Sequence, residues 1–344
     1  MLDGTQLMSD KSPVLSDAFV INLDRTPQRL DHFRKINPHL SDVARFPATD
    51  GRALKHDELI RQGLFEAPIF YSTGALGAMH SHIRLWELAA SKDSWTTVFE
   101  DDAIVHQGFD VLAPSLLDTA GDWDIVLWGW NFDEAVSFDL FPGVPSLTHS
   151  SQQDMRKMAM AIQSAPTQPT LRRLYYGFGL VGYSISPVGA RKLLERALPS
   201  RPFLYKVPLF GLEVENTGID SVTSVLYSEL NAFACVPPLV ITPNEHADST
   251  THESDADVIN RIRRKFGLST GGGGQYSGFR PESWPDYLGG RKFTRKYLNY
   301  LNRKGDIFGT VVECIRYCLM RSHWYEDFCR RRYRRRQGSE PSSK

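Results

Sequence analysis

Trp95-Thr96-Thr97-Val98-Phe99-Glu100-Asp101-Asp102 is a run of β-branched and aromatic residues that ends abruptly in three carboxylates. Thr, Val, Phe and Trp fit a covered, pleated surface, so the run predicts a buried strand. Because side chains alternate along an extended chain, we expect Glu100 and Asp102 on one side and Asp101 on the other. Two carboxylates at the carboxyl end of a strand suit a hard divalent cation, and ligands bind at that end of an open α/β sheet. The pattern favours a metal-assisted site over its alternative, a hydrated acidic turn.

The composition is that of an ordinary soluble globular protein. The chain has 344 residues, of which 41% are hydrophobic and 23% charged, enough for one large domain or two modest ones. No stretch reaches the roughly 18 apolar residues that a membrane span requires. The polar residues 1–17 lack the apolar core of a signal peptide, and the four cysteines form no CxxC pair. These features predict a cytoplasmic protein without a disulfide framework or a zinc site.

The charge is distributed unevenly, although the net charge is zero. Residues 291–344 hold 15 Lys/Arg and 5 Asp/Glu, a formal charge of +10, which leaves −10 for the rest. Six arginines surround Tyr333, and residues 307–319 place apolar side chains on one face of a possible helix. A basic amphipathic segment is typical of a helix that docks on an anionic membrane or a partner. The alternatives are a solvated tail and a nucleic-acid contact, which is unlikely because the body is acidic.

Strand-like and helix-like segments alternate through the first 250 residues, which predicts an α/β layered fold. We expect a flexible N-terminus at 1–17, a main domain at 18–255 with a variable loop at 131–170, a linker at 256–290 and a basic segment at 291–344. The predicted strands lie near residues 18–23, 45–47, 95–100, 124–128, 175–186 and 232–240. The predicted helices lie near residues 27–36, 76–90, 187–194 and 218–230.

Four motifs in order resemble glycosyltransferase family 25, which contains the lipooligosaccharide galactosyltransferases and their collagen-modifying relatives. The resemblance covers about residues 18–250 and has weaker matches after residue 190. The chain departs from the family where Ala75 replaces an acid and Ala78 replaces a Cys. The four motifs are Phe19-Val20-Ile21-Asn22-Leu23-Asp24-Arg25 with Arg29, Pro47-Ala48-Thr49-Asp50-Gly51, Gly74-Ala75-Leu76-Gly77-Ala78-Met79-His80-Ser81-His82 and Phe99-Glu100-Asp101-Asp102.

The resemblance implies a GT-A fold, in which a Rossmann-like nucleotide-binding sheet carries a metal-binding acidic triplet. It implies transfer of a hexose, most often galactose from UDP-galactose, with inversion to a β-linkage and with Mn²⁺ or Mg²⁺ as the metal. The acceptor would be a glycan or glycolipid such as a lipooligosaccharide core, met at the inner face of the membrane. Another UDP-sugar, a protein or lipid hydroxyl as acceptor, and a non-catalytic GT-A-fold binding protein are the alternatives.

The metal ligands that we expect are Glu100 and Asp102, with His246 as a third, because imidazole also suits Mn²⁺. They would bridge the cation to the diphosphate and neutralise the leaving UDP. Asp101 would instead face the ribose or bond a neighbouring backbone group.

The nucleotide pocket would be lined by residues that follow the first strand, with arginine on phosphate oxygens. The alternatives are local: Asp24 could cap a helix, Arg29 could be a surface charge, and Asp50 beside Gly51 is common in turns. The candidate residues are Asn22, Asp24, Arg25, Arg29 and Asp50.

Two further candidates, Ser81 and His82, precede the acidic strand on a predicted helix. A lone His there is more often a core residue than a catalyst, and the pair could orient the acidic loop. An inverting transfer also needs a general base for the acceptor hydroxyl. We expect Asp220, which could alternatively cap its helix, with Glu213 and Glu215 in reserve.

Overall fold

The computed structural model describes residues 17–67, 71–132, 134–150, 152–201, 203–206 and 213–243. The chain divides into two compact units, residues 1–252 and 253–344, and every described residue belongs to the first. His246, the predicted linker and the basic segment therefore lie outside the described residues. Within the described part, even the 18-residue α3 is not apolar enough to cross a membrane.

A nine-stranded mixed sheet forms the centre of the described unit, in the order β2-β1-β3-β9-β5-β12-β8-β6-β7. β1 is parallel to β2 and β3, and β5 is parallel to β12, while β9 runs antiparallel between β3 and β5. The carboxyl ends of five strands therefore meet at one edge, where β9 begins. The strands are β1 (Ala18–Asn22), β2 (Ala44–Pro47), β3 (Thr96–Glu100), β5 (Ile125–Gly129), β6 (Val136–Phe141), β7 (Val144–Thr148), β8 (Thr170–Tyr176), β9 (Gly182–Ile185) and β12 (Ala232–Val236).

Two short ladders lie outside this sheet. β4 (Ile104–Val105) pairs with β13 (Val240–Ile241), and β10 (Leu204–Lys206) pairs with β11 (Glu213–Glu215). β4 directly follows the acidic turn, so its pairing with β13 brings Val240 and Ile241 close to the edge where β3 ends.

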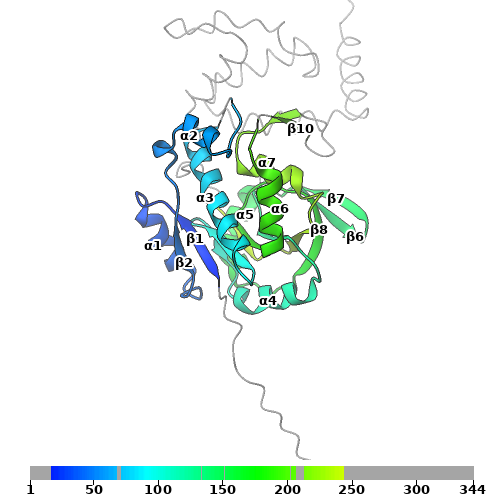
Figure 1. The fold of residues 1–344 in the computed structure, drawn as a ribbon. Helices are drawn as coiled ribbons and strands as arrows, with labels where there is room; N and C mark the ends of the chain where they lie inside the picture. The colour runs from blue at the N-terminus through cyan, green and yellow to red at the C-terminus, as the bar shows by residue number, and fades with distance from the viewer. Residues whose placement is uncertain are drawn as a thin grey trace, which may run out of the picture. The chain divides into compact units, whose positions relative to one another are not determined.

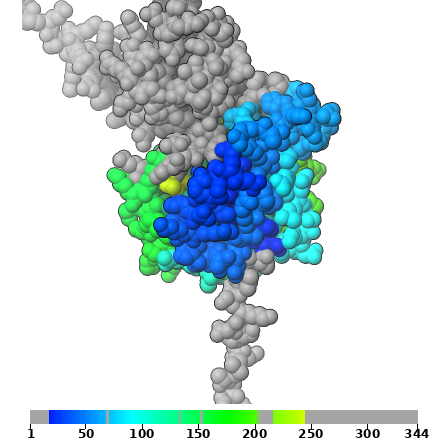
Figure 2. All heavy atoms as spheres, turned by 90° about the vertical axis from the view of Figure 1, so that its left-hand side faces the viewer, coloured from blue at the N-terminus to red at the C-terminus, as the bar shows by residue number. Residues whose placement is uncertain are grey.

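Helices cover both faces of the sheet, and α3, α6 and α7 pack against one another on one of them (Figure 1). Figure 2 views the side on which the first described residues, in blue, lie at the surface. Pro187 begins α6 after Ser186, whose hydroxyl accepts a hydrogen bond from the Gly189 N–H as an N-cap. The helices are α1 (Pro27–Ile36), α2 (His56–Arg61), α3 (Thr73–Ala90), α4 (Phe109–Thr119), α5 (Gln152–Ser164), α6 (Pro187–Ala197) and α7 (Ile219–Leu226).

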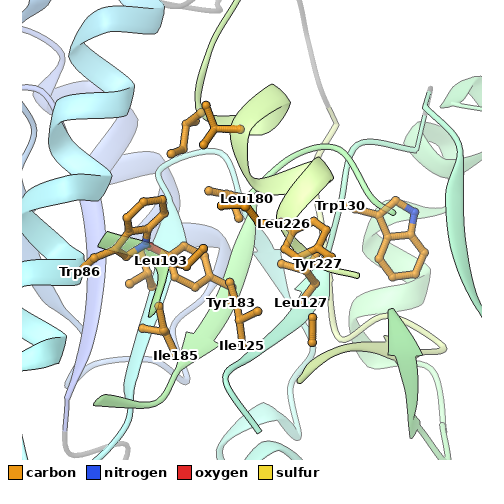
Figure 3. Packing of buried hydrophobic residues seen from close by; sticks show 14 of the residues in the cluster. Trp86, Ile125, Leu127, Trp130, Leu180, Tyr183, Ile185, Leu193, Leu226 and Tyr227 are labelled. Atoms are coloured by element: carbon orange, nitrogen blue, oxygen red, sulfur yellow. The ribbon is translucent and has the colours of Figure 1, made fainter. Parts of the chain in front are cut away.

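Each face of the sheet has its own hydrophobic core, because side chains alternate along the strands. On β5, Leu127 joins the core under α3, α6 and α7, whereas Trp128 joins the core under α1 and α4. Figure 3 shows the first core, in which Trp86 of α3 donates a hydrogen bond to the Tyr183 hydroxyl of β9 at 3.2 Å. The two cores make the unit a three-layer α/β structure.

The predicted α/β class is thus confirmed, as is a Rossmann-like sheet flanked by helices. The structure differs from the expected loop at 131–170, which contains the β6–β7 hairpin and α5. The hairpin turns at Gly143, whose φ is 77°, and the Gly143 N–H donates to the Asp139 carboxylate at 2.9 Å. In α5, Met155, Ala159 and Ile162 share the face that packs on the core, a helical spacing that the sequence analysis overlooked.

Two glycines allow the loop after β2 to lie directly on α3. A methyl group added at Gly77 would be 2.6 Å from the Thr49 carbonyl oxygen, and one at Gly51 would be 1.8 Å from the Thr73 carbonyl oxygen. Ser81 fixes the same contact, because its hydroxyl accepts from the Thr49 N–H at 2.8 Å and donates to the Gly77 carbonyl at 2.7 Å. The second and third sequence motifs are therefore two sides of one backbone contact.

We predict that Gly77→Ala lowers the free energy of unfolding by about 1–3 kcal/mol, the usual cost of overpacking. In an open helix this change would instead stabilise by about 1 kcal/mol, so the sign tests the contact. Urea unfolding measures it, with Gly177→Ala as the control, because the nearest atoms to a methyl group there are 3.5 Å away. A Gly77→Ala protein as stable as the control would contradict the close approach.

Candidate active site

The acidic turn lies where β3 ends, at the edge shared by the carboxyl ends of the parallel strands. The Glu100 N–H donates to the Val181 carbonyl at 2.9 Å, and the Ala103 N–H donates to the Glu100 carbonyl at 3.1 Å. The first bond ties the turn to the segment that enters β9, and the second closes the turn. Glu100, Asp101 and Asp102 are all only partly exposed.

Asp101 is held by two side chains from the start of the chain. Its carboxylate accepts from Asn22 Nδ2 at 2.7 Å and from Arg29 Nε at 2.7 Å. Arg29 Nη2 also lies 3.6 Å from Asp102 Oδ2. Asn22 is buried at the end of β1, and its Nδ2 donates as well to the Thr26 carbonyl at 3.0 Å. The structure thus places two predicted nucleotide-pocket residues, Asn22 and Arg29, on the acidic turn itself.

The acids form a site with excess negative charge. Desolvation raises the pKa of Glu100 well above its usual range, and the charges of Asp102, Asp220 and Asp101 raise it further. Desolvation also raises the pKa of Asp102, while Arg29 and a hydrogen bond from Thr242 act in the opposite direction. Three carboxylates around the single cation Arg29, with Asp220 near Glu100, favour binding of a further cation or a proton.

One oxygen of this site is available for a ligand. Asp102 Oδ1 is buried and has no hydrogen-bond partner among the described residues. An unpartnered buried carboxylate oxygen beside a second carboxylate fits a divalent cation that completes its shell with waters or phosphates. Within the described ranges no three His, Cys, Asp or Glu side chains converge as a complete ligand set. The predicted third ligand, His246, lies outside them.

Asn37 fixes the far side of the acidic turn and was not found by the sequence analysis. This buried side chain donates from Nδ2 to the Ala103 carbonyl at 2.9 Å, and its Oδ1 accepts from the Val105 N–H at 2.8 Å. Gln163 Nε2 donates to Asn37 Oδ1 at 3.2 Å. No sequence signal marks Asn37, since it lies 66 residues from Ala103.

Asp220 comes from a different element but lies near Glu100. It lies in the first turn of α7, after the N-cap residue Gly218, so it is not the cap itself. The Gly179 N–H donates to it, and desolvation raises the pKa of Asp220 to about 6. Its effect on the pKa of Glu100 places the two carboxylates near each other. Glu213 and Glu215 lie on β11, and their side chains are outside the described part.

The remaining nucleotide-pocket candidates form ion pairs with one another or with other arginines. Asp50 accepts from the Arg52 N–H at 3.0 Å, which begins a short 3-10 helix, and from Arg25 Nε at 3.2 Å. Hydrogen bonds from Arg52 hold the pKa of Asp50 well below its usual range. Asp24 is 82% exposed and pairs with Arg45. The contacts of Asp50 match the alternative that assigned it to a turn.

His82 is a core residue. Its ring is buried, with Nδ1 3.0 Å from the Tyr183 hydroxyl, and desolvation lowers the pKa of His82 to about 3. Ser81 forms the contact between α3 and the loop after β2 that is described above. Both residues therefore support the scaffold beneath the acidic turn.

Comparisons with known proteins agree with the motifs. A family model described as "Glycosyltransferase family 25 (LPS biosynthesis protein)" matches residues 16–206. A protein of Aedes aegypti named "Glycosyltransferase 25 family member" is 29% identical over 264 residues, which are 72% of this chain and 39% of that protein. A protein of Anopheles gambiae with the same name is 24% identical over 265 residues, 72% of this chain and 40% of its own.

A third relative differs in its name. A protein of Rattus norvegicus named "Probable inactive glycosyltransferase 25 family member 3" is 27% identical over 265 residues, 70% of this chain and 40% of that protein. The chain spans about two fifths of the length of these curated relatives. The family match contains the acidic turn but ends before Asp220.

We predict that His82 makes stability depend on pH. Between pH 6.5 and about 3 only the unfolded state binds the proton, so the free energy of unfolding falls on acidification by about 1.4 kcal/mol per pH unit. His82→Gln removes this dependence. Between about pH 7 and about pH 5, the free energy of unfolding measured in urea should therefore fall by roughly 2 kcal/mol more in wild type than in the variant. His56→Gln, at an exposed position of α2, should behave as wild type. Equal losses in wild type and His82→Gln would contradict the prediction.

Proposed function

The chain belongs to glycosyltransferase family 25, and from this we propose that it is a metal-dependent inverting glycosyltransferase. It transfers a hexose, foremost galactose from UDP-galactose, to a hydroxyl of a glycan or glycolipid such as a lipooligosaccharide core. The observation that carries the proposal is the acidic turn, with the unpartnered Asp102 Oδ1 beside Glu100. Glu100 and Asp102 would hold Mn²⁺ or Mg²⁺, which when bound neutralises the diphosphate of the leaving nucleotide.

Other residues near the acidic turn would deprotonate the acceptor and hold the turn in place. Asp220, as a carboxylate, accepts the proton of the acceptor hydroxyl as the new bond forms on the face opposite the leaving group. A pKa near 6 suits this role, because the group is mostly ionised at neutral pH and still a better base than an ordinary aspartate. Arg29 and Asn22 hold Asp101, and thereby the turn, in place.

A second candidate is a non-catalytic GT-A-fold binding protein. The name of the rat relative, "Probable inactive", is the observation that favours it. It would bind a nucleotide sugar without turnover. The complete acidic turn and the nearby Asp220 favour the enzyme.

The location follows from the proposed acceptor. A lipid-linked glycan would be met at the inner face of the membrane by a cytoplasmic enzyme. The +10 charge of residues 291–344 suits attachment to an anionic surface at about 1 kcal/mol for each basic residue near it. These residues lie outside the described part of the chain.

We predict that Asp102→Asn lowers metal-dependent UDP release at least about 100-fold, because one ligand of the charge-neutralising site is lost. UDP release from a panel of UDP-sugars is measured with Mn²⁺ and with EDTA, and water serves as a slow acceptor. Asp93→Asn, an exposed acid on the loop before β3, is the matched control. If the wild type binds UDP in a metal-dependent way but turns over no UDP-sugar, the second candidate, a non-catalytic binding protein, is indicated. Full activity of Asp102→Asn would overturn the metal assignment.

We predict that kcat/KM falls on acidification below an apparent pKa of about 6, because only the ionised Asp220 accepts a proton. Below this apparent pKa, kcat/KM should fall about tenfold per pH unit. Asp220→Asn should lower the rate at neutral pH and abolish this acidic limb. An unchanged limb in Asp220→Asn would assign the base to another residue.

A further inference from the structure

Asn131 follows the central strand β5 in a rigid position. Its N–H donates to the Phe178 carbonyl at 2.7 Å, and its carbonyl accepts from the Glu134 N–H at 3.1 Å. The residues on either side, Trp130 and Phe132, are both buried, with ring centroids 5.3 Å apart. Because neighbouring side chains project in different directions, burying these two rings leaves the Asn131 carboxamide outside the core, where it is partly exposed.

The carboxamide lies beside the proposed general base. Gly179 has a φ of 96°, and a methyl group there would be 2.5 Å from Asn131 Oδ1. The N–H of the same glycine donates to Asp220. Asn131 and Asp220 therefore flank one residue. Two residues after Gly179, the Val181 carbonyl accepts a hydrogen bond from the Glu100 N–H at 2.9 Å. Residues 179–181 therefore connect Asn131 and Asp220 to the acidic turn.

The strand order explains this convergence. β9 lies between β3 and β5, and Gly182 pairs with both Phe99 and Gly129. The segment that enters β9 thus passes between the end of β3, with Glu100, and the end of β5, with Asn131. Leu180 and Trp130 belong to one buried core cluster, which holds both segments in place (Figure 3).

The chemistry of this group suits a sugar hydroxyl. Within the described part of the chain the Asn131 carboxamide makes no hydrogen bond, although its backbone is fixed. It offers two donors and an acceptor without charge. A neutral donor–acceptor group matches a hydroxyl, which also donates and accepts, whereas phosphate is better matched by arginine.

We propose that Asn131 binds a hydroxyl of the hexose at the reacting centre and thereby helps to choose among hexoses that differ at one carbon. This inference rests on the proposed function. The hexose is either the one carried by the UDP-sugar or the one that accepts it. A site built to bond a substrate hydroxyl discriminates against an analogue that lacks it or presents it differently, because its polar group then stays unpaired.

The test compares Asn131→Ala and the nearly isosteric Asn131→Asp with wild type. Hydrolysis of UDP-galactose and UDP-glucose gives kcat/KM for the donor, and transfer to free galactose or lactose gives the acceptor KM. Binding of UDP alone and the melting temperature are measured for each protein. Asn231→Ala is the matched control, because Asn231 is exposed at the opposite, amino-terminal end of β12.

The expected result is either a fall of at least about tenfold in kcat/KM for the preferred UDP-sugar, with a changed ratio between UDP-galactose and UDP-glucose, or a rise of at least about tenfold in acceptor KM. UDP affinity and melting temperature should stay at the wild-type values. Slower hydrolysis with a raised donor KM, and an unchanged acceptor KM, assigns Asn131 to the donor hexose. A raised acceptor KM with unchanged hydrolysis assigns it to the acceptor. Both outcomes support the proposal.

Two results would overturn it. If wild type is active and both variants keep its kcat/KM, acceptor KM and epimer ratio, Asn131 does not bind the hexose. If UDP affinity and melting temperature fall together with activity, its role is structural. A wild type that turns over no UDP-sugar refutes the proposed function instead, so the two failures are distinguishable.

Discussion

Mutual repulsion among four carboxylates is the constraint around which this structure is organised. Glu100, Asp101 and Asp102 end one strand, and Asp220 of α7 lies near Glu100. Hydrogen bonds to charged groups contribute about 1.5–3 kcal/mol each, and Asp101 accepts such bonds from Asn22 and Arg29. Desolvation, together with the remaining repulsion from neighbouring acids, raises the pKa values of Glu100 and Asp102. A folded protein that keeps this arrangement gives up stability for a site suited to cations.

Features with a local cause could be predicted from the sequence. The apolar runs before Glu100 and around Leu127 predicted strands, and β3 and β5 confirm them, because burial on both faces requires such runs. Pro27 marked the beginning of α1, since its fixed φ suits the first helical turn. The α/β class follows from the alternation of these elements.

Features that depend on distant contacts could not be predicted. Arg29 reaches Asp101 over 72 residues and Asn37 reaches Ala103 over 66, and nothing near either residue in the sequence encodes these contacts. Asn131 is ordinary in sequence and becomes notable only because β9 inserts between β3 and β5. The β6–β7 hairpin is a different case, because Pro142-Gly143 is a local turn signal that the expected loop at 131–170 does not take into account.

Two tryptophans donate hydrogen bonds to side chains of β9 from opposite faces of the sheet. Trp86 donates to the Tyr183 hydroxyl at 3.2 Å, and Trp128 donates to the hydroxyl of the next residue, Ser184, at 2.8 Å. Each indole is fully buried, so the strand can neither tilt nor slide without breaking a buried hydrogen bond. Gly179 lies just before this strand. A ligand that binds there meets a pre-organised backbone, and little of its binding free energy is lost in ordering the chain.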